Sequence, residues 1–385
     1  MTSVQRQAAR WHLRPDAMIE LLHLPPWATS RLVVPGRAAR RLGERSRRQR
    51  LLHAAWPVLS RSLELDPGWR VHRVPPTVGN VTVALVGGSA PAAVLKIAST
   101  PQGTAALERS AQVVELLESD ARLADWSHVL PRRLRAIPTH DGELVVLEQL
   151  LPGRDAASLV TGTDLWRVVP ETLRCIGALH QATTAVLTVG QALLQRWVDE
   201  PLLVLARWYA DGGRPRSVAL DQLRARLHND LAGRVVRVGW IHGDLHPGNV
   251  LLRPDTLEVS GLLDWERADH AGLPDVDVAH LLLSVRMATQ RRELGELVCR
   301  VLDGRTTLSL DGEVPEQAAV LLCWLHHVSG IVSKTDRFRC GGYWAARNVD
   351  LVVAHAEAWS KATSATRSVA RPRPLHHDRP SDSDR

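Results

Sequence analysis

The segment from Trp240 to Leu252 constrains this chain more than any other part of the sequence. It reads Trp-Ile-His-Gly-Asp-Leu-His-Pro-Gly-Asn-Val-Leu-Leu and sets Asp244 five residues before Asn249. A second aspartate, Asp264, follows an apolar pair beyond a turn at residues 253–256. Carboxylate and amide oxygens are the hard ligands that Mg²⁺ prefers, and a carboxylate can also orient a hydroxyl. The pattern therefore predicts a loop and hairpin on which the three side chains converge.

The bulk composition is that of a globular protein. The chain has 385 residues, of which 45% are hydrophobic and 23% charged. It contains no run of about 18 apolar residues, so no membrane span is expected. The first residues lack the apolar core of a secretion signal, and we expect a cytoplasmic protein. Four widely spaced cysteines form no CxxC pair, which predicts free thiols.

Lysine is rare in this sequence, and one lysine stands in an apolar setting. Lys and Arg total 48, but only Lys96, Lys334 and Lys361 are lysines. Lys96 lies in the strand-like run 92–98, where a buried cation without a partner would be costly. A phosphate group would remove that cost.

The pattern of apolar residues divides the chain into a β-rich and a helical part. Strands are expected at 69–74, 81–86, 92–98 and 143–151, and a helix from Pro101 to about Glu118 with Thr100 as its N-cap. From about residue 154 the pattern is mainly helical, interrupted by a hairpin of 249–252 and 259–263. The helical stretches span residues 164–187, 275–302, 315–334 and 343–362.

These features together resemble the aminoglycoside phosphotransferase family of kinase-like enzymes. The resemblance rests on residues 242–249 and 263–266, with weaker support from 178–180, Gly79-Asn80 and 274–279. It implies an α+β, bilobal protein-kinase-like fold with a small β-rich N-lobe and a larger helical C-lobe. We expect a basic, mostly helical extension at 1–69, the N-lobe at 70–152, the C-lobe at 153–365 and a disordered tail at 366–385.

The resemblance also implies a site for ATP and Mg²⁺. Asp244 would be the catalytic base, and Asn249 and Asp264 would hold magnesium. Nucleotide contacts would come from the phosphate-binding Lys96, the turn at Gly79 and Asn80, and a hinge containing Glu148 and Leu150. The lysine's usual glutamate partner, on the following helix, would fall at Ser110. Glu108 lies two residues away, about 200° around a helix, so the partner is either Glu108 after a register shift or another residue.

The sequence leaves several interpretations open. The acceptor is a small-molecule alcohol: either an aminoglycoside or, given the net charge of +7, a neutral or anionic sugar-like alcohol. One alternative is a kinase-like nucleotide-binding protein without turnover, and another is a metal-dependent hydrolase using His242, Asp244 and His246. We favour His242 as a structural residue and His246 as a loop residue near substrate. Asp277 would brace the loop or start a helix.

The arginines between residues 37 and 50 form either a solvated helix face or a patch for an anionic partner. Since no base-reading motif accompanies them, no nucleic-acid partner is expected, and the pattern does not set the oligomeric state.

Overall fold

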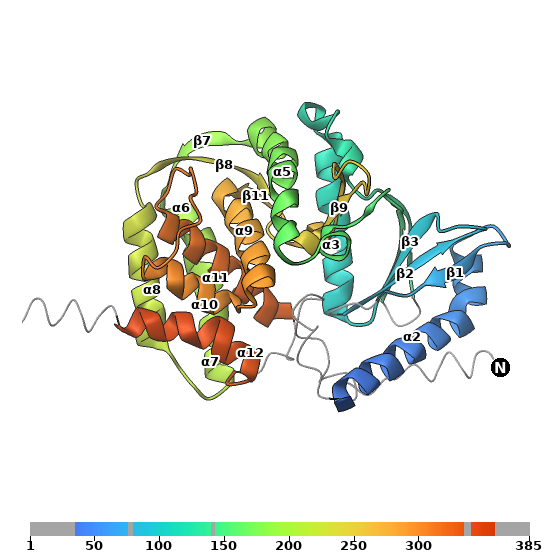
Figure 1. Ribbon diagram of the computed structural model, residues 1–385, viewed down its shortest axis with the longest axis horizontal. Coiled ribbons are helices and arrows are strands. Elements are labelled where there is room, and N and C mark those ends of the chain that lie inside the picture. The colour runs from blue at the N-terminus through green and yellow to red at the C-terminus, as the bar shows by residue number, and fades with distance from the viewer. Residues whose placement is uncertain (1–34, 76–79, 140–142, 335–339, 359–385) are drawn as a thin grey trace, which may run out of the picture.

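The fold consists of a β-rich lobe and a larger helical lobe, with one long helix, residues 101–119, between them (Figure 1). The computed structural model describes residues 35–75, 80–139, 143–334 and 340–358. The N-lobe contains a five-stranded sheet with helices α2 (Pro35–Ser62) and α3 (Pro101–Ser119), and the C-lobe contains the remaining described helices and two small sheets. The predicted α+β, bilobal kinase-like class is confirmed. Residues 1–34 of the predicted extension and the predicted tail lie outside the described residues.

The N-lobe sheet is antiparallel, with strand order β1-β2-β3-β5-β4. Its strands are β1 (Arg70–Arg73), β2 (Val81–Gly87), β3 (Ala93–Ala98), β4 (Arg133–Pro138) and β5 (Leu144–Gln149). Successive side chains of a strand point to opposite faces. One face thus carries Leu95 and Leu147 into the core shared with α2, while the other carries Ala98 and Val146, which pack with Leu107.

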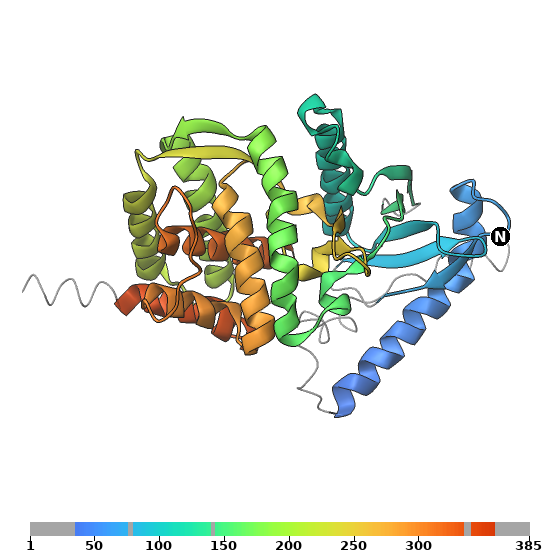
Figure 2. The ribbon, with the colours of Figure 1, turned by 45° about the horizontal axis from the view of Figure 1, so that its top comes forward.

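Helix α2 (Pro35–Ser62) covers the outer face of this sheet (Figure 2). Leu52, on the helix, and Leu63, just after it, join the core formed by Val71, Val86 and other sheet residues. The end of the predicted N-terminal extension is therefore packed onto the β-rich lobe. The side chains of the clustered arginines up to Arg48 lie outside the described part, and Arg50 is exposed.

Helix α3 (Pro101–Ser119) lies between the two lobes in Figures 1 and 2. The Thr100 hydroxyl accepts a hydrogen bond of 3.1 Å from the Gly103 amide, which confirms the predicted N-cap. Val114 and Leu117 of α3 pack in one core cluster with Trp265 of the C-lobe. Apolar packing therefore fixes α3 to the segment that follows Asp264.

The C-lobe core is built mainly from helices. These are α5 (Val169–Thr183), α7 (Glu200–Asp211), α8 (Ser217–Leu231), α9 (Pro274–Gln290), α10 (Leu294–Leu302) and α11 (Glu316–Lys334). The helix expected over 275–302 is two helices, α9 and α10, because Arg291 adopts a left-handed conformation (φ 56°) between them. None of the described helices is long and apolar enough to cross a membrane. All four cysteines are free thiols, as predicted.

Two small sheets interrupt the helical pattern of the C-lobe. The predicted hairpin is confirmed as β9 (Val250–Leu252) and β10 (Val259–Leu262), with β6 (Arg154–Asp155) beside β9. The second sheet was not predicted and joins β7 (Ala185–Thr188), β8 (Val235–Ile241) and β11 (Asp269–Gly272). The prediction of helix over 164–187 is wrong at its C-terminal end, because residues 185–188 pair with β8.

The packing of α2 predicts a clear difference between two of its apolar residues. Leu52 is 3% exposed and Val58 is 44% exposed. We expect Leu52→Ala to lower the free energy of unfolding by about 2–5 kcal/mol, since it leaves a cavity against the sheet. Val58→Ala is the matched control and should change it by less than about 0.5 kcal/mol. Urea denaturation followed by circular dichroism measures both, and equal effects would contradict this packing.

Candidate active site

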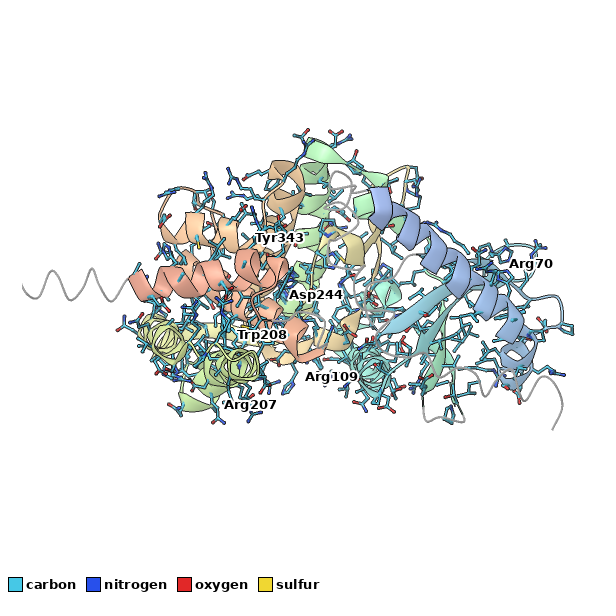
Figure 3. The ribbon with its side chains drawn as sticks, turned by 90° about the horizontal axis from the view of Figure 1, so that it is seen from below. Arg70, Arg109, Arg207, Trp208, Asp244 and Tyr343 are labelled. Atoms are coloured by element: carbon cyan, nitrogen blue, oxygen red, sulfur yellow. The ribbon has the colours of Figure 1, made fainter. Side chains whose placement is uncertain are left out.

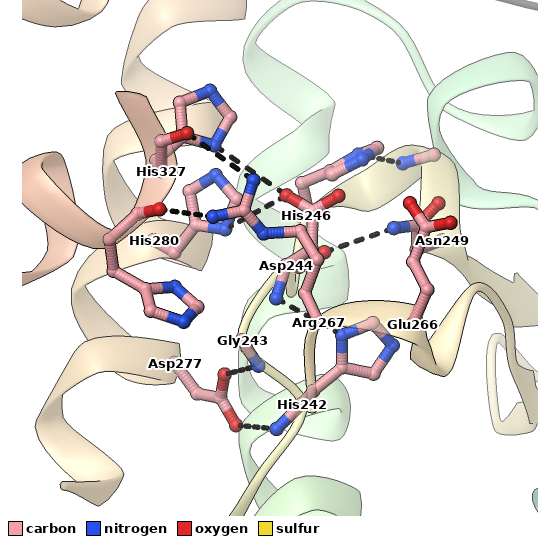
Figure 4. Close-up of polar contacts among 12 residues, drawn as sticks. His242, Gly243, Asp244, His246, Asn249, Glu266, Arg267, Asp277, His280 and His327 are labelled. Carbon is pink, nitrogen blue, oxygen red and sulfur yellow. Dashed lines mark hydrogen bonds and ion pairs between the residues drawn. The ribbon is translucent and has the colours of Figure 1, made fainter. Parts of the chain in front are cut away.

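The loop that carries Asp244 is held by one buried carboxylate. Asp277, on α9, is fully buried, and its two oxygens accept hydrogen bonds from the His242 amide (2.7 Å) and the Gly243 amide (2.8 Å) (Figure 4). His180 contacts the same carboxylate through Nε2 at 3.1 Å. Gly243 has φ 73°, a conformation that favours glycine. Asp277 thus aligns the turn immediately before Asp244, which confirms the bracing interpretation.

His242 links the loop to Leu263, which lies between strand β10 and Asp264. Its ring is fully buried, Nε2 lies 2.8 Å from the Leu263 carbonyl, and Nδ1 accepts from the Asp244 amide at 3.3 Å. Both ring nitrogens are therefore used by the backbone of the loop and of the neighbouring segment, as expected of a structural residue. His246 Nδ1 accepts from the Gly248 amide at 3.0 Å. Among the described residues, these two histidines do not join Asp244 in a metal-ligating group.

Asn249 and Asp264 are held on the same hairpin. The Asn249 side-chain amide donates to the Asp244 carbonyl (3.0 Å), and its own backbone carbonyl accepts from the Leu263 amide (2.9 Å). Asp264 follows with a left-handed backbone (φ 62°) and a carboxylate that is 54% exposed. A non-glycine residue in this conformation is uncommon and aims the side chain in a direction that an extended residue would not.

Lys96 is paired with a residue that sequence reasoning assigned elsewhere. Its ammonium lies 2.9 Å from Glu148 Oε2 and 3.4 Å from Asp264 Oδ1, and the lysine side chain is 8% exposed. Burial alone would lower the pKa of Lys96, but the charges of Glu148 and Asp264 outweigh it and raise the pKa. Lys96 is therefore a cation that bridges the N-lobe sheet and the C-lobe hairpin.

Strand register explains this pairing. Val94 of β3 lies opposite Glu148 of β5, and Lys96 lies opposite Val146. Residues opposite one another, and their diagonal neighbours two positions on, share a face of the sheet. Lys96 and Glu148 are such a diagonal pair. Glu108 is exposed and borders a shallow surface hollow with Thr100 and Thr104, so the Glu108 alternative is wrong for this structure.

The remaining predicted nucleotide-binding residues are placed as follows. Gly79 lies outside the described residues. The Asn80 side chain donates to the Lys334 carbonyl at the end of α11 (3.2 Å), which joins the two lobes. Glu148 lies inside β5 with its side chain on Lys96, and Leu150 follows the end of that strand. Of the two expected hinge residues, Leu150 alone lies beyond the sheet.

Asp244 lies at the junction of the lobes, where two histidines face it that the sequence analysis did not single out (Figures 3 and 4). Its Oδ1 atom is 3.7 Å from His280 Nδ1, on α9, and 3.6 Å from His327 Nδ1, on α11. Burial alone would raise the pKa of Asp244. The nearby His327 ring and the positive potential of neighbouring groups, including Arg267, hold the pKa of Asp244 well below its usual range. Asp244 is thus a carboxylate anion at neutral pH.

The other acidic residues near the loop have partners of their own. Glu266 forms an ion pair with Lys334, and Asp269 accepts from the Arg196 guanidinium at 2.9 Å. Arg267, between them in sequence, donates to the backbone carbonyls of His326 and His327. Around Asp244 the described side chains are therefore imidazoles and a guanidinium rather than unpaired carboxylates.

The family model of the phosphotransferase enzyme family matches residues 70–310. The chain belongs to this family. The resemblance seen in the sequence is thereby confirmed, and the family transfers phosphoryl groups to small-molecule hydroxyls. The match begins at residue 70, after helix α2. No curated protein matches the sequence significantly.

Among solved structures, the aminoglycoside phosphotransferase APH(4)-Ia aligns with 80% of this chain and 98% of its own, at 13% identity and a TM-score of 0.50. The enzyme APH(3'')-Id from Streptomyces rimosus aligns with 71% of this chain and 97% of its own, at 20% identity and a TM-score of 0.44. A thermostable APH(4)-Ia mutant solved with ADP and hygromycin B covers 82% and 99%, at 15% identity and a TM-score of 0.46. At these identities the likeness to APH(4)-Ia concerns the fold alone.

The brace on the loop predicts the effect of Asp277→Asn. In the asparagine variant the amide nitrogen would face one of the two backbone donors, and the negative charge opposite His180 would be lost. The free energy of unfolding should therefore fall by about 3 kcal/mol at neutral pH. Asp221→Asn, which alters a surface pair with Arg224, should cost no more than about 0.5 kcal/mol. Urea denaturation of both variants provides the measurement.

The difference in unfolding free energy between wild type and Asp277→Asn should depend on pH, because the Asp277 carboxylate titrates. Burial alone would raise the pKa of Asp277, but His180 and the backbone donor hold it below its ordinary value. A lowered folded-state pKa gives stability that is present above the unfolded pKa and is lost as pH falls through the folded one. The gap between wild type and Asp277→Asn should therefore shrink below about pH 4. A gap that is constant down to strongly acid pH would contradict the assignment.

Proposed function

We propose that this family member transfers the γ-phosphate of ATP to a hydroxyl of a small molecule. Asp244 acts as the catalytic base, Lys96 contacts the nucleotide phosphates, and Asn249 and Asp264 hold Mg²⁺. The observation that carries the proposal is the convergence of Lys96, from the N-lobe, with Asp264, from the C-lobe hairpin that also holds Asn249 beside Asp244. Family membership supports the reaction class.

The donor set of Asn249 and Asp264 fits a magnesium ion. The Asn249 side-chain nitrogen is used by the Asp244 carbonyl, so its amide oxygen is the atom left to face a cation. Asp264 offers a half-exposed carboxylate. Mg²⁺ takes such oxygen ligands and keeps several waters. When bound with the nucleotide, it would neutralise charge on the phosphate oxygens.

Asp244 supplies the group that an attacking hydroxyl needs. It is ionised at neutral pH, so it can accept a hydrogen bond from the hydroxyl and direct the oxygen lone pair toward phosphorus. Its low pKa suits a reaction in which the bond to the leaving group loosens early, because the proton then moves late. The Asp277 brace and His242 hold the backbone amides up to that of Asp244 itself, and Arg267 and the histidines lie near the carboxylate.

The surroundings of Asp244 also bear on the acceptor. A polycationic aminoglycoside is recognised best by unpaired carboxylates, whereas Glu266 and Asp269 are each paired with a cation of the chain. Arg267 adds a positive charge close to Asp244. We therefore favour a neutral or anionic alcohol, such as a sugar, over an aminoglycoside. A transfer screen over aminoglycosides, neutral sugars and acidic sugars, with product masses measured, tests this, and a clear preference for aminoglycosides would refute it.

Asp244→Asn tests the catalytic assignment. The amide keeps the size of the side chain but cannot take a proton, so kcat should fall by about 10²–10⁴-fold. Nucleotide affinity with Mg²⁺, measured by calorimetry, should stay unchanged because the base does not hold the phosphates. A variant that keeps most of its rate would contradict the role. A wild-type chain that binds nucleotide but transfers phosphate to no acceptor would favour a binding protein without turnover.

A matched pair of glutamates tests the placement of Lys96. Glu148→Gln removes the nearer negative charge from the buried ammonium, and we expect kcat/KM for ATP to fall by about 10- to 100-fold. Glu108→Gln is the control, and its kinetics should match wild type because Glu108 is exposed and away from Lys96. If Glu108→Gln were the more damaging change, a glutamate on α3 would be the partner in the working enzyme.

A further inference from the structure

The strongest cluster outside the expected ATP and magnesium contacts lies on the far side of Asp244. Among the described residues, the group of side chains able to hold a metal ion is Asp244, His280 and His327. Each offers one ligand atom, and these atoms lie within 4.8 Å of one another. They come from three elements, namely the catalytic loop, α9 and α11. This cluster includes the proposed catalytic base, Asp244, but neither of the proposed magnesium ligands, Asn249 and Asp264.

The atoms at the centre of this cluster are buried and lack hydrogen-bond partners. Asp244 Oδ1, His280 Nδ1 and His327 Nδ1 are all buried polar atoms without a hydrogen bond. The His280 side chain is 5% exposed, and those of Asp244 and His327 are 21% and 22% exposed. Buried polar atoms are normally satisfied, so three that face one another point to a shared partner that is missing from their surroundings.

The separations suit an ion better than direct hydrogen bonds. The carboxylate oxygen is 3.7 and 3.6 Å from the two nitrogens, beyond the usual 2.7–3.2 Å of such bonds. Ligands about 2.1 Å from a tetrahedral ion lie about 3.4 Å apart. The third separation, between the imidazoles, is at most 4.8 Å, so a modest ring rotation completes the geometry.

We propose that Asp244, His280 and His327 form a binding site for a divalent transition-metal ion of the zinc class. Two imidazoles and one carboxylate are a ligand set that suits Zn²⁺ and its neighbours, whereas Mg²⁺ prefers oxygen ligands alone. Three protein ligands leave a fourth position for water. The nearby Arg267 guanidinium opposes a second cation, but it is held by the carbonyls of His326 and His327.

The site has one consequence that rests on the proposed function. The ion and the acceptor hydroxyl would both use Asp244, so the bound metal should inhibit phosphate transfer in competition with the acceptor and not with ATP. This consequence is separate from metal binding itself, which requires neither nucleotide nor acceptor. Failure of the proposed function would therefore leave the binding experiment intact, and failure of metal binding would leave the transfer assay intact.

The test is a titration of the full chain, without a polyhistidine tag, by Co²⁺ and by Zn²⁺. We expect one equivalent of Co²⁺ to give the intense visible absorption of a low-coordinate site and Zn²⁺ to displace it. A large excess of Mg²⁺ should not displace the Co²⁺. His327→Gln and His280→Gln should each weaken metal binding by at least about 100-fold. Loss of a residue that only hydrogen-bonds to a ligand already costs about 10- to 100-fold, and loss of the ligand itself costs more.

The control is His270→Gln, which changes an exposed histidine of the same lobe, 64% exposed, and should leave the affinity unchanged. His327 is partly exposed, so its variant keeps the test usable if the buried His280 variant fails to fold; thermal melting checks both. Absence of a stoichiometric site, or equal binding by wild type, His327→Gln and His280→Gln, would overturn the proposal.

Discussion

A buried ammonium group without counter-charges would destabilise this fold, and Lys96 has two carboxylates against it. Glu148 comes from the neighbouring strand of the same sheet, and Asp264 comes from the hairpin of the other lobe. The position of the sheet relative to the hairpin is therefore tied to an electrostatic requirement as well as to apolar packing. Because α3 packs on Trp265, next to Asp264, both contacts act on the same short segment.

The parts of the site that lie close together in sequence could be predicted. The spacing of Asp244 and Asn249 and the apolar strand before Asp264 are local patterns, and local hydrogen bonds of the hairpin realise them. The cap of α3 is likewise set by adjacent residues. The partner of Lys96 could not be found in this way, because it was expected on the helix that follows the lysine strand. The pairing depends instead on the register of β3 against β5, which brings Lys96 and Glu148 together although they are 52 positions apart in sequence.

The histidines facing Asp244 also escaped sequence reasoning for a physical reason. His280 and His327 lie on two helices, far from Asp244 in sequence and without a shared spacing, so only the packing of α9 beside α11 brings them to the loop. Strand β7 escaped because all four of its residues are exposed, which leaves no alternation of apolar and polar side chains to distinguish it from a helix end. Helix α2 belongs with the sheet it covers, although the family match begins after it.

Lys334 contacts both the N-lobe and the segment that follows Asp264. Its carbonyl accepts from Asn80 of the N-lobe, while its ammonium forms an ion pair with Glu266, two residues beyond Asp264. Rotation of the sheet away from the helices would stretch the first of these links and, through the same residue, pull on the second. The end of α11 thus connects the N-lobe sheet to the segment that carries Asp264, so a change in the angle between the lobes would reach that segment through Lys334.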